Sequence, residues 1–276
     1  MRLESIMAAI DSAIERFRKH LDTTGGRASL ERFDRHLKSA PESACAEAAV
    51  FDLLSSRGLS PTLADDPSTG GVDISCSFAG SAFAVEVTAL TSETVASRCV
   101  RLQDPANGFS LDTNAFLDLV SKRVSSKGTN KQAKSSTLPR VLAIVSSHPF
   151  AQALIRVAAP ELITGRAGRA WPVNASGAAG ESYSFTQLKS AAHLRFDETL
   201  KPQTFRPRDA LVLLAALNAD QLAVLGIQNP KPASELPAAA FSFLPTVQLK
   251  AGIGEPSLIV GWSSEDHEPY AHSFTK

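Results

Sequence analysis

The chain has 276 residues, is 43% apolar and carries 28 basic and 28 acidic side chains, so its formal net charge is zero. This composition is sufficient for a sizeable buried core, and it excludes a protein that binds polyanions through bulk positive charge alone. Three scattered cysteines, Cys45, Cys76 and Cys99, form no CxxC pair, which argues against a disulfide framework and against a zinc knuckle.

The first 40 residues predict a helical extension. Apolar residues recur at helical spacing over residues 3 to 21, and a second helix is expected over residues 28 to 39, before Pro41. These two helices either pack on the main domain or form the contact of a homodimer. Because the chain has no run of about 18 apolar residues and its first helix contains acids, we expect no membrane segment and no targeting peptide, with a cytoplasmic location as the default.

Residues 41 to 276 predict a single α/β domain. A helix begins at Pro41 and ends before Gly58, where glycine is a common stop. Two strands follow, then a helix over residues 112 to 128, and then an apolar run at 140 to 147 that is typical of a strand buried on both faces. The order helix, strand, strand, helix, strand indicates a layered α/β architecture.

The C-terminal half predicts further strands of the same sheet. We expect a helix over residues 150 to 163, a surface loop over 167 to 182, and strands at 210 to 217, 221 to 227 and 257 to 263. The first two of these strands are separated by three residues, which favours a hairpin. The expected result is one mixed central sheet that is extended by C-terminal strands.

Two carboxylates occupy the polar face of the predicted strand pair. Apolar residues alternate with small or polar ones over residues 72 to 88. If the chain reverses at Ala79 and Gly80, residues whose numbers sum to 159 lie opposite each other, so Asp73 faces Glu86 with Cβ atoms about 5 Å apart. Two like charges at that distance are unfavourable unless one takes a proton or a cation lies between them. The pair therefore predicts a metal site.

Basic residues gather in one window of the sequence. No acid occurs between Asp118 and Glu161, and seven positive charges fall there: Lys122, Arg123, Lys127, Lys131, Lys134, Arg140 and Arg156. Such a window favours contact with a phosphate backbone. The alternative is a solvated basic helix face with no partner.

Together these residues resemble the PD-(D/E)xK nuclease superfamily. The features are Glu47 in the helix that begins at Pro41, Asp73 after a glycine turn, the VEVT sequence at 85 to 88, and a following helix rich in lysine. The resemblance covers residues 41 to 147 and implies a restriction-endonuclease-like core. It also implies hydrolysis of phosphodiester bonds in nucleic acid, with DNA as the expected substrate and Mg²⁺ or Mn²⁺ as the cofactor.

The resemblance implies a role for each of these residues. Asp73, Glu86 and the backbone carbonyl of Val87 are the expected metal ligands, and Glu47 would hold a metal-bound water or a second ion. The chemistry suits this independently, because Mg²⁺ prefers oxygen ligands and keeps several waters, so one or two carboxylates on a rigid sheet suffice.

The sequence departs from the superfamily pattern at Thr88, where the family has a lysine that stabilises the transition state. Some members carry that lysine on the next helix instead. Lys127 is our first choice for it, because it follows Val120 by seven residues and Val124 by three, and Lys131 is the second. The further residues expected to contact nucleic acid are Lys122, Lys131, Gln132 and Lys134.

Each acid also has a purely structural interpretation. Glu47 can be a solvated helix residue, Asp73 can end a turn, and Glu86 can form a buried salt bridge to Lys127 or to an arginine. If no lysine reaches the carboxylates, the chain is a catalytically degenerate member of the fold that acts as a nucleic-acid-binding or scaffold module.

Overall fold

A computed structural model of the chain provides the coordinates. The residues that it describes are 3–64, 73–102, 109–128, 137–164, 166–170, 183–187, 195–196, 202–203, 209–218, 220–230, 232–237, 239–251, 258–263 and 268–274.

Helices and strands alternate along the described part of the chain. Its helices are α1 (Leu3–Thr24), α2 (Gly26–Ser39), α3 (Pro41–Ser56), α4 (Ser92–Cys99), α5 (Thr113–Gly128) and α7 (Ala151–Thr164). The strands of the central sheet are β1 (Thr62–Leu63), β2 (Ile74–Phe78), β3 (Ser81–Leu90), β6 (Arg140–Ser146), β11 (Asp209–Leu217), β12 (Gln221–Gln228), β13 (Thr246–Ala251), β14 (Leu258–Trp262) and β15 (Tyr270–Ser273). Three short pairs lie outside it: β4 (Val100–Leu102) with β5 (Phe109–Leu111), β7 (Arg166–Ala170) with β8 (Tyr183–Gln187), and β9 (Arg195–Phe196) with β10 (Pro202–Gln203).

The central sheet is mixed, as the sequence predicts. Its order is β1-β2-β3-β6-β11-β12-β13-β14, with β15 paired to β12. Strand β3 is antiparallel to β2 and parallel to β6, and β6 is parallel to β11. All seven residues of β6 are buried, which confirms a strand that is covered on both faces. The hairpin of β11 and β12 and the extension of the sheet by C-terminal strands are confirmed as well.

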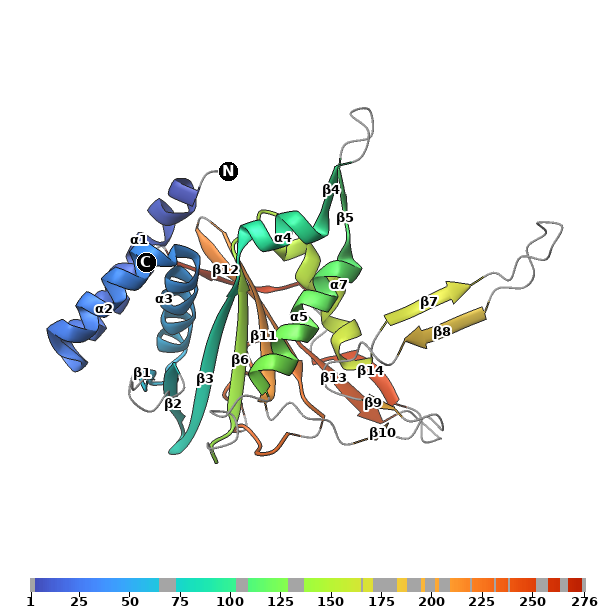
Figure 1. Cartoon of the computed structure of the whole chain (residues 1–276). Coiled ribbons are helices and arrows are strands. Elements are labelled where there is room, and N and C mark those ends of the chain that lie inside the picture. The colour runs from blue at the N-terminus through green and yellow to red at the C-terminus, as the bar shows by residue number, and fades with distance from the viewer. Residues whose placement is uncertain are drawn as a thin grey trace.

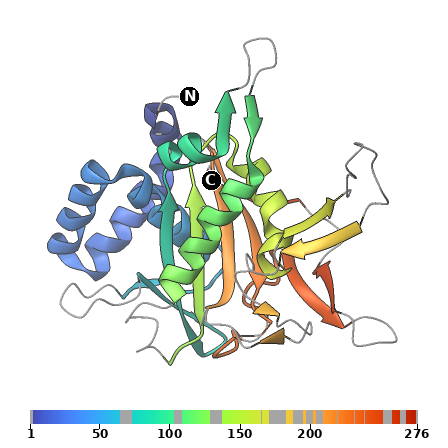
Figure 2. The same cartoon turned by 45° about the vertical axis from the view of Figure 1, so that its right-hand side comes forward.

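Helices cover both faces of the sheet (Figure 1). Helices α1, α2 and α3 lie on one side, and α4, α5 and α7 lie on the other, as the rotated view also shows (Figure 2). Residues that alternate along each strand divide between two cores. Val85 and Val87 of β3 point into the first core, under α1 to α3. Leu90 points into the second core with the apolar side of α5. Glu86 lies an even number of residues from Leu90, so its side chain leaves β3 on the α5 side.

The hairpin of β2 and β3 has the predicted register. Ala79 and Gly80 form a two-residue turn with φ of 50° and 81°, the positive values that a type I′ turn requires at both positions. Ile74 pairs with Val85, so paired residue numbers sum to 159. Asp73 directly precedes β2 in this register and therefore stands opposite Glu86.

The N-terminal helices pack on the main domain. Helix α1 buries Phe17 in the first core, and Ser12 Oγ donates to the backbone carbonyl of Phe274 at 2.7 Å. Asp52 of α3 binds Arg16 of α1 at 2.5 Å and His272 of β15 at 2.8 Å. The N-terminal helices therefore pack on the main domain, which is the first of the two predicted arrangements. Through these contacts they lie beside residues 272 to 274.

This Asp52 contact provides a stability prediction. The carboxyl group has a lowered pKa, because hydrogen bonds from His272 and Arg16 outweigh the effect of burial. Asp52→Asn removes the charge, and we expect a loss of about 1.5–3 kcal/mol at pH 7, the range for hydrogen bonds to charged groups. The loss should shrink as the pH falls below about 4, where the parent carboxylate itself takes up a proton. Urea unfolding measures it, with Glu31→Gln on the exposed surface of α2 as the control; equal losses in both variants would contradict it.

Some elements differ from the sequence prediction. The loop expected at 167 to 182 is wrong in part, because residues up to 170 belong to strand β7. Helix α4 and strand β13 were not predicted. The sequence of β13, TVQLKA, alternates polar and apolar residues over only a short stretch, which is a weak signal. None of the described helices is both long enough and apolar enough to cross a membrane.

Candidate functional site

The site lies at the start of β2, beside the part of β3 that continues past the last paired residues. Asp73 lies beside the free stretch of β3, and Val87 N–H donates to its Oδ2 at 2.7 Å. The N–H and C=O groups of one strand residue point to the same side. The carbonyl of Val87 therefore faces the same open edge as the Asp73 carboxylate.

Lys127 contacts Glu86, the acid of strand β3. It occupies the last turn of α5, and its Nζ lies 2.7 Å from Glu86 Oε1. Helix α5 packs on the second core through Val120 and Val124, the two residues from which the reach of Lys127 was predicted. Asp73, Glu86 and Lys127 are therefore brought together, whereas Thr88, the residue at which the sequence departs from the resemblance, is buried in the strand.

Two further charged residues extend this group across the sheet. Arg140 opens β6, and its Nη2 lies 2.9 Å from Glu86 Oε2. Its Nε lies 2.9 Å from Oδ1 of Asp209, which opens β11. The same guanidinium donates from Nη2 to the backbone carbonyl of Lys127 at 3.0 Å. A chain of alternating charge thus runs from Asp209 through Arg140 and Glu86 to Lys127.

This charge chain is deeply buried. Glu86, Arg140 and Asp209 are 3%, 2% and 0% exposed. The contacts of Arg140 Nε with Asp209 and of Nη2 with Glu86 are close charge contacts without aligned hydrogen bonds. Burial raises the pKa of Asp209 to about 6; Arg140 opposes this rise and Glu86 adds to it.

Asp73 is the acid with the most unfavourable surroundings. Burial raises its pKa to about 7, and the Val87 N–H group opposes this rise. The charges of Glu47 and Glu86 raise the pKa further, and Lys127 lowers it. Close to neutral pH this carboxylate is therefore on the point of taking up a proton, or a cation in its place.

Glu47 lies on the opposite side of the sheet from Lys127. It lies on α3, and its Oε2 is 3.6 Å from Nδ1 of His36 on α2. The pKa of His36 is raised, first by its contact with the Glu47 carboxylate and also by the charge of Asp73. His36 was not predicted as a site residue, because its approach depends on how α2 docks against α3.

The facing acids do not by themselves require a metal, and that step of the sequence argument is wrong. The register is as predicted, but Lys127 and Arg140 already neutralise Glu86. Glu86 therefore forms the buried salt bridge that was its purely structural interpretation. Of the two acids, only Asp73 retains the unfavourable electrostatic environment that the sequence argument assigned to both.

The donor set is compatible with a water-rich divalent site. In the described part of the chain, no group of three His, Cys, Asp or Glu side chains could hold a metal ion. Mg²⁺ needs fewer protein ligands, because it keeps several waters and takes one or two carboxylates. The Asp73 carboxylate and the Val87 carbonyl are oxygen atoms of the kind that Mg²⁺ or Mn²⁺ takes.

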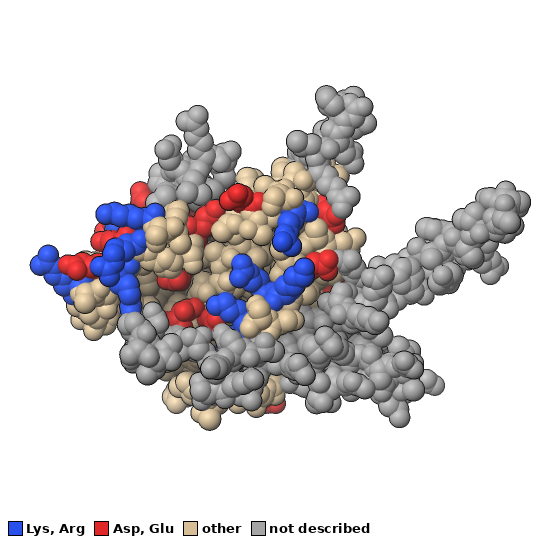
Figure 3. Space-filling view, viewed as in Figure 1, with Lys and Arg blue, Asp and Glu red and all other residues tan. Residues whose placement is uncertain are grey.

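Basic side chains lie over the outer surface of α5, next to the site (Figure 3). Lys122 and Arg123 are exposed there, and Lys127 is half-buried. The other predicted nucleic-acid contacts, Lys131, Gln132 and Lys134, lie outside the described residues.

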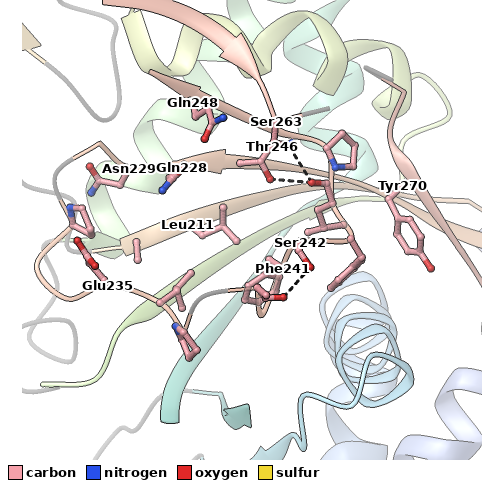
Figure 4. A pocket seen from close by; sticks show the side chains of 18 of the residues that line it. Leu211, Gln228, Asn229, Glu235, Phe241, Ser242, Thr246, Gln248, Ser263 and Tyr270 are labelled. Atoms are coloured by element: carbon pink, nitrogen blue, oxygen red, sulfur yellow. Dashed lines mark hydrogen bonds between the residues drawn. The ribbon is translucent and has the colours of Figure 1, made fainter. Parts of the chain in front are cut away.

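A cavity of about 1130 Å³ lies elsewhere, beside β12 and β13 (Figure 4). Its lining combines apolar residues of the first core, such as Leu211 and Phe241, with the amides of Gln228 and Gln248 and the carboxylate of Glu235. Three of its lining hydroxyl groups, those of Ser242, Thr246 and Ser263, donate to backbone carbonyls. Neither Asp73 nor the charge chain is among its described lining residues.

Comparison of the chain with family models, with curated proteins and with solved structures finds no match.

Proposed function

We propose that this protein is a divalent-metal-dependent nuclease that hydrolyses phosphodiester bonds, with DNA as the substrate, on a restriction-endonuclease-like core. The observation that carries the proposal is the convergence of Asp73, Glu86 and Lys127 at one open strand edge. The order of elements supports it, because α3, the antiparallel strands β1 to β3, α5 and the parallel strand β6 follow one another in the order that the resemblance implies.

Each of these residues has a separate role in the proposed hydrolysis. A bound divalent ion would polarise the phosphoryl oxygen and lower the pKa of an attacking water. Asp73 supplies the carboxylate for that ion, with a neighbouring acid. Lys127 places a positive charge beside the same edge, where it stabilises charge that develops on the phosphoryl oxygens. The exposed Lys122 and Arg123 bind the phosphate backbone through charge.

A cleavage assay on plasmid, linear and single-stranded DNA with Mg²⁺ or Mn²⁺ tests this proposal. Asp73→Asn keeps an oxygen that accepts the Val87 N–H bond and removes the charge, and Lys127→Met keeps the length of the side chain. Both should reduce cleavage by about 10²-fold or more, the usual effect of losing one transition-state contact. Lys19→Met on the exposed surface of α1 is the control and should cleave like the parent. Cleavage that survives both site substitutions would remove the proposal.

The pairing of Glu86 with Arg140 favours a second candidate, a degenerate nuclease fold that binds nucleic acid without cutting. A carboxylate paired with the buried Arg140 and the half-buried Lys127 is a poor metal ligand, and Thr88 stands where the resemblance leads us to expect a lysine. Calorimetric titration with Mg²⁺ or Mn²⁺ separates the two candidates. A chain that binds DNA but neither ion supports the second.

A further inference from the structure

One basic group beside the site lies on α5. Lys127 Nζ is 2.7 Å from Glu86 Oε1, so the last turn of this helix lies at the acids. Arg123 lies one helical turn before Lys127 on the same side of the helix, and Lys122 precedes it. Both side chains are exposed, and α5 carries three lysines and arginines against one acid. Lys122 and Arg123 are called the α5 group below.

A second basic group lies on α2, on the other face of the sheet. His36 of this helix lies beside Glu47, with 3.6 Å between Nδ1 and Oε2. Arg32 lies one helical turn before His36, and the exposed Arg35 directly precedes it. Helix α2 carries four lysines and arginines against two acids. Arg32 and Arg35 are called the α2 group below.

The acids of α2 do not neutralise this second group. Glu31 pairs with Arg27 at 2.9 Å, and Asp34 pairs with Arg18 of α1 at 2.8 Å. Among the ion pairs of the described residues, none includes Arg35. The outer surface of α2 therefore keeps a positive charge that packing of the extension does not use.

Both groups belong to one face of the molecule. Lysine and arginine side chains gather there over the N-terminal helices and over α5, and acidic side chains lie in the space between them (Figure 3). Helix α2 packs on α3, α3 packs on β3, and α5 packs on the neighbouring β6. Each packed layer takes about 10 Å, so the axes of α2 and α5 are about 20 Å or more apart.

We infer that this face binds double-stranded DNA, with one phosphate backbone on the α5 group and the other on the α2 group. A duplex presents two backbones along a major groove about 12 Å wide, and the long side chains of both groups span the remaining distance. The acids between the groups repel phosphate and therefore face the groove, whereas a single strand has one backbone and needs only one group. The inference rests on the proposed function for its partner, and it adds the N-terminal extension to the nucleic-acid interface.

Binding of a fluorescein-labelled duplex of about 20 base pairs to the full chain, measured by anisotropy in EDTA over a range of salt concentrations, tests this inference. EDTA prevents cleavage, so that binding is measured alone. A single strand of the same sequence is measured in parallel. The variants that remove the two groups are Arg32→Gln/Arg35→Gln on α2 and Lys122→Gln/Arg123→Gln on α5.

Arg27→Gln/Lys38→Gln is the matched control. It removes two charges from the same helix as the α2 variant, and both side chains are exposed. Arg27 lies about two and a half turns before His36, and Lys38 lies about half a turn after it, so both are on the side of α2 away from His36. The control therefore separates a contact with DNA from a general effect of charge.

Loss of either group should raise the Kd for the duplex at least about tenfold near 0.1 M salt. The slope of log Kd against log salt concentration should fall by about 1.8, because each phosphate contact contributes about 0.9. The control should keep the slope of the parent. The single strand should bind the α2 variant within about threefold of the parent, because the α5 group is still present.

The inference is overturned if the parent binds no duplex in EDTA, if the α2 variant keeps the slope of the parent, or if the control loses as much as the α2 variant does. Equal losses for the single strand and the duplex would also overturn it. If the α2 variant fails to fold, Arg35→Gln alone gives the answer through half the expected change in slope, since Arg35 is exposed and in no ion pair.

The proposed function is decided separately, by metal-dependent cleavage. Cleavage by a chain whose α2 group makes no contribution to binding overturns the inference and leaves the proposed function. Duplex binding by both groups without cleavage supports the inference and removes the nuclease.

Discussion

Arg140→Met should destabilise the protein by about 3–5 kcal/mol, the cost of breaking a buried ion pair by removing one partner. Arg140 is 2% exposed and is the only lysine or arginine paired with Asp209 among the described residues. Its loss leaves Asp209 buried without a compensating charge and leaves Glu86 with Lys127 alone. Urea unfolding at pH 7 measures the change in the free energy of unfolding.

Arg156→Met is the matched control for this experiment. Arg156 pairs with Glu268 at the same distance of 2.9 Å, but both side chains are about half exposed. Exposed pairs contribute less than about 1 kcal/mol, so the control isolates the effect of burial. The double variant Arg140→Met/Asp209→Leu should recover part of the loss, because apolar groups replace a buried pair at little cost. Equal losses for Arg140→Met and Arg156→Met would contradict the assignment of a buried charge chain.

Local patterns are sufficient to predict the hairpin and the reach of Lys127. Alternation within β2 and β3 and the turn at Ala79 and Gly80 set the register that brings Asp73 opposite Glu86. Lys127 follows from spacing along a single helix. Both are properties of residues that lie close together in the sequence, and the periods of strand and helix determine them.

The charge chain and the approach of His36 could not be predicted in the same way. Arg140 meets Glu86 because β6 lies parallel to β3 with Ala84 opposite Arg140, a register that is set by a crossover of about 50 residues. Asp209 joins them through a second parallel pairing. The available signal was a charged residue at the start of each apolar run, which indicates a partner but does not identify it. The salt bridge of Glu86 to Lys127 or to an arginine was one of the interpretations that the sequence left open, and the tertiary structure identifies Lys127 and Arg140 as its partners.

Asp73→Asn should make the metal-free protein more stable at pH 8 and leave its stability nearly unchanged at pH 4. The folded pKa of Asp73 is about 7, against an ordinary value of 3.8, so the folded chain holds this proton more tightly than the unfolded chain does. The stability that this group contributes is therefore complete below about pH 4 and is lost as the pH rises through 7. A shift of this size, reduced for partial exposure to solvent, corresponds to about 2–3 kcal/mol.

Unfolding curves in EDTA at pH 4, 6 and 8 measure this difference, with Asp22→Asn on the exposed surface of α1 as the control. The parent and the control should lose stability between pH 4 and pH 8 relative to Asp73→Asn. Parallel pH profiles of stability for all three proteins would contradict the raised pKa of Asp73 in the folded chain. Adding Mn²⁺ at pH 8 should stabilise the parent by RT ln(1 + [Mn²⁺]/Kd) and should have much less effect on Asp73→Asn. Such a result would show that the charge which destabilises the metal-free fold is the same charge that binds the ion.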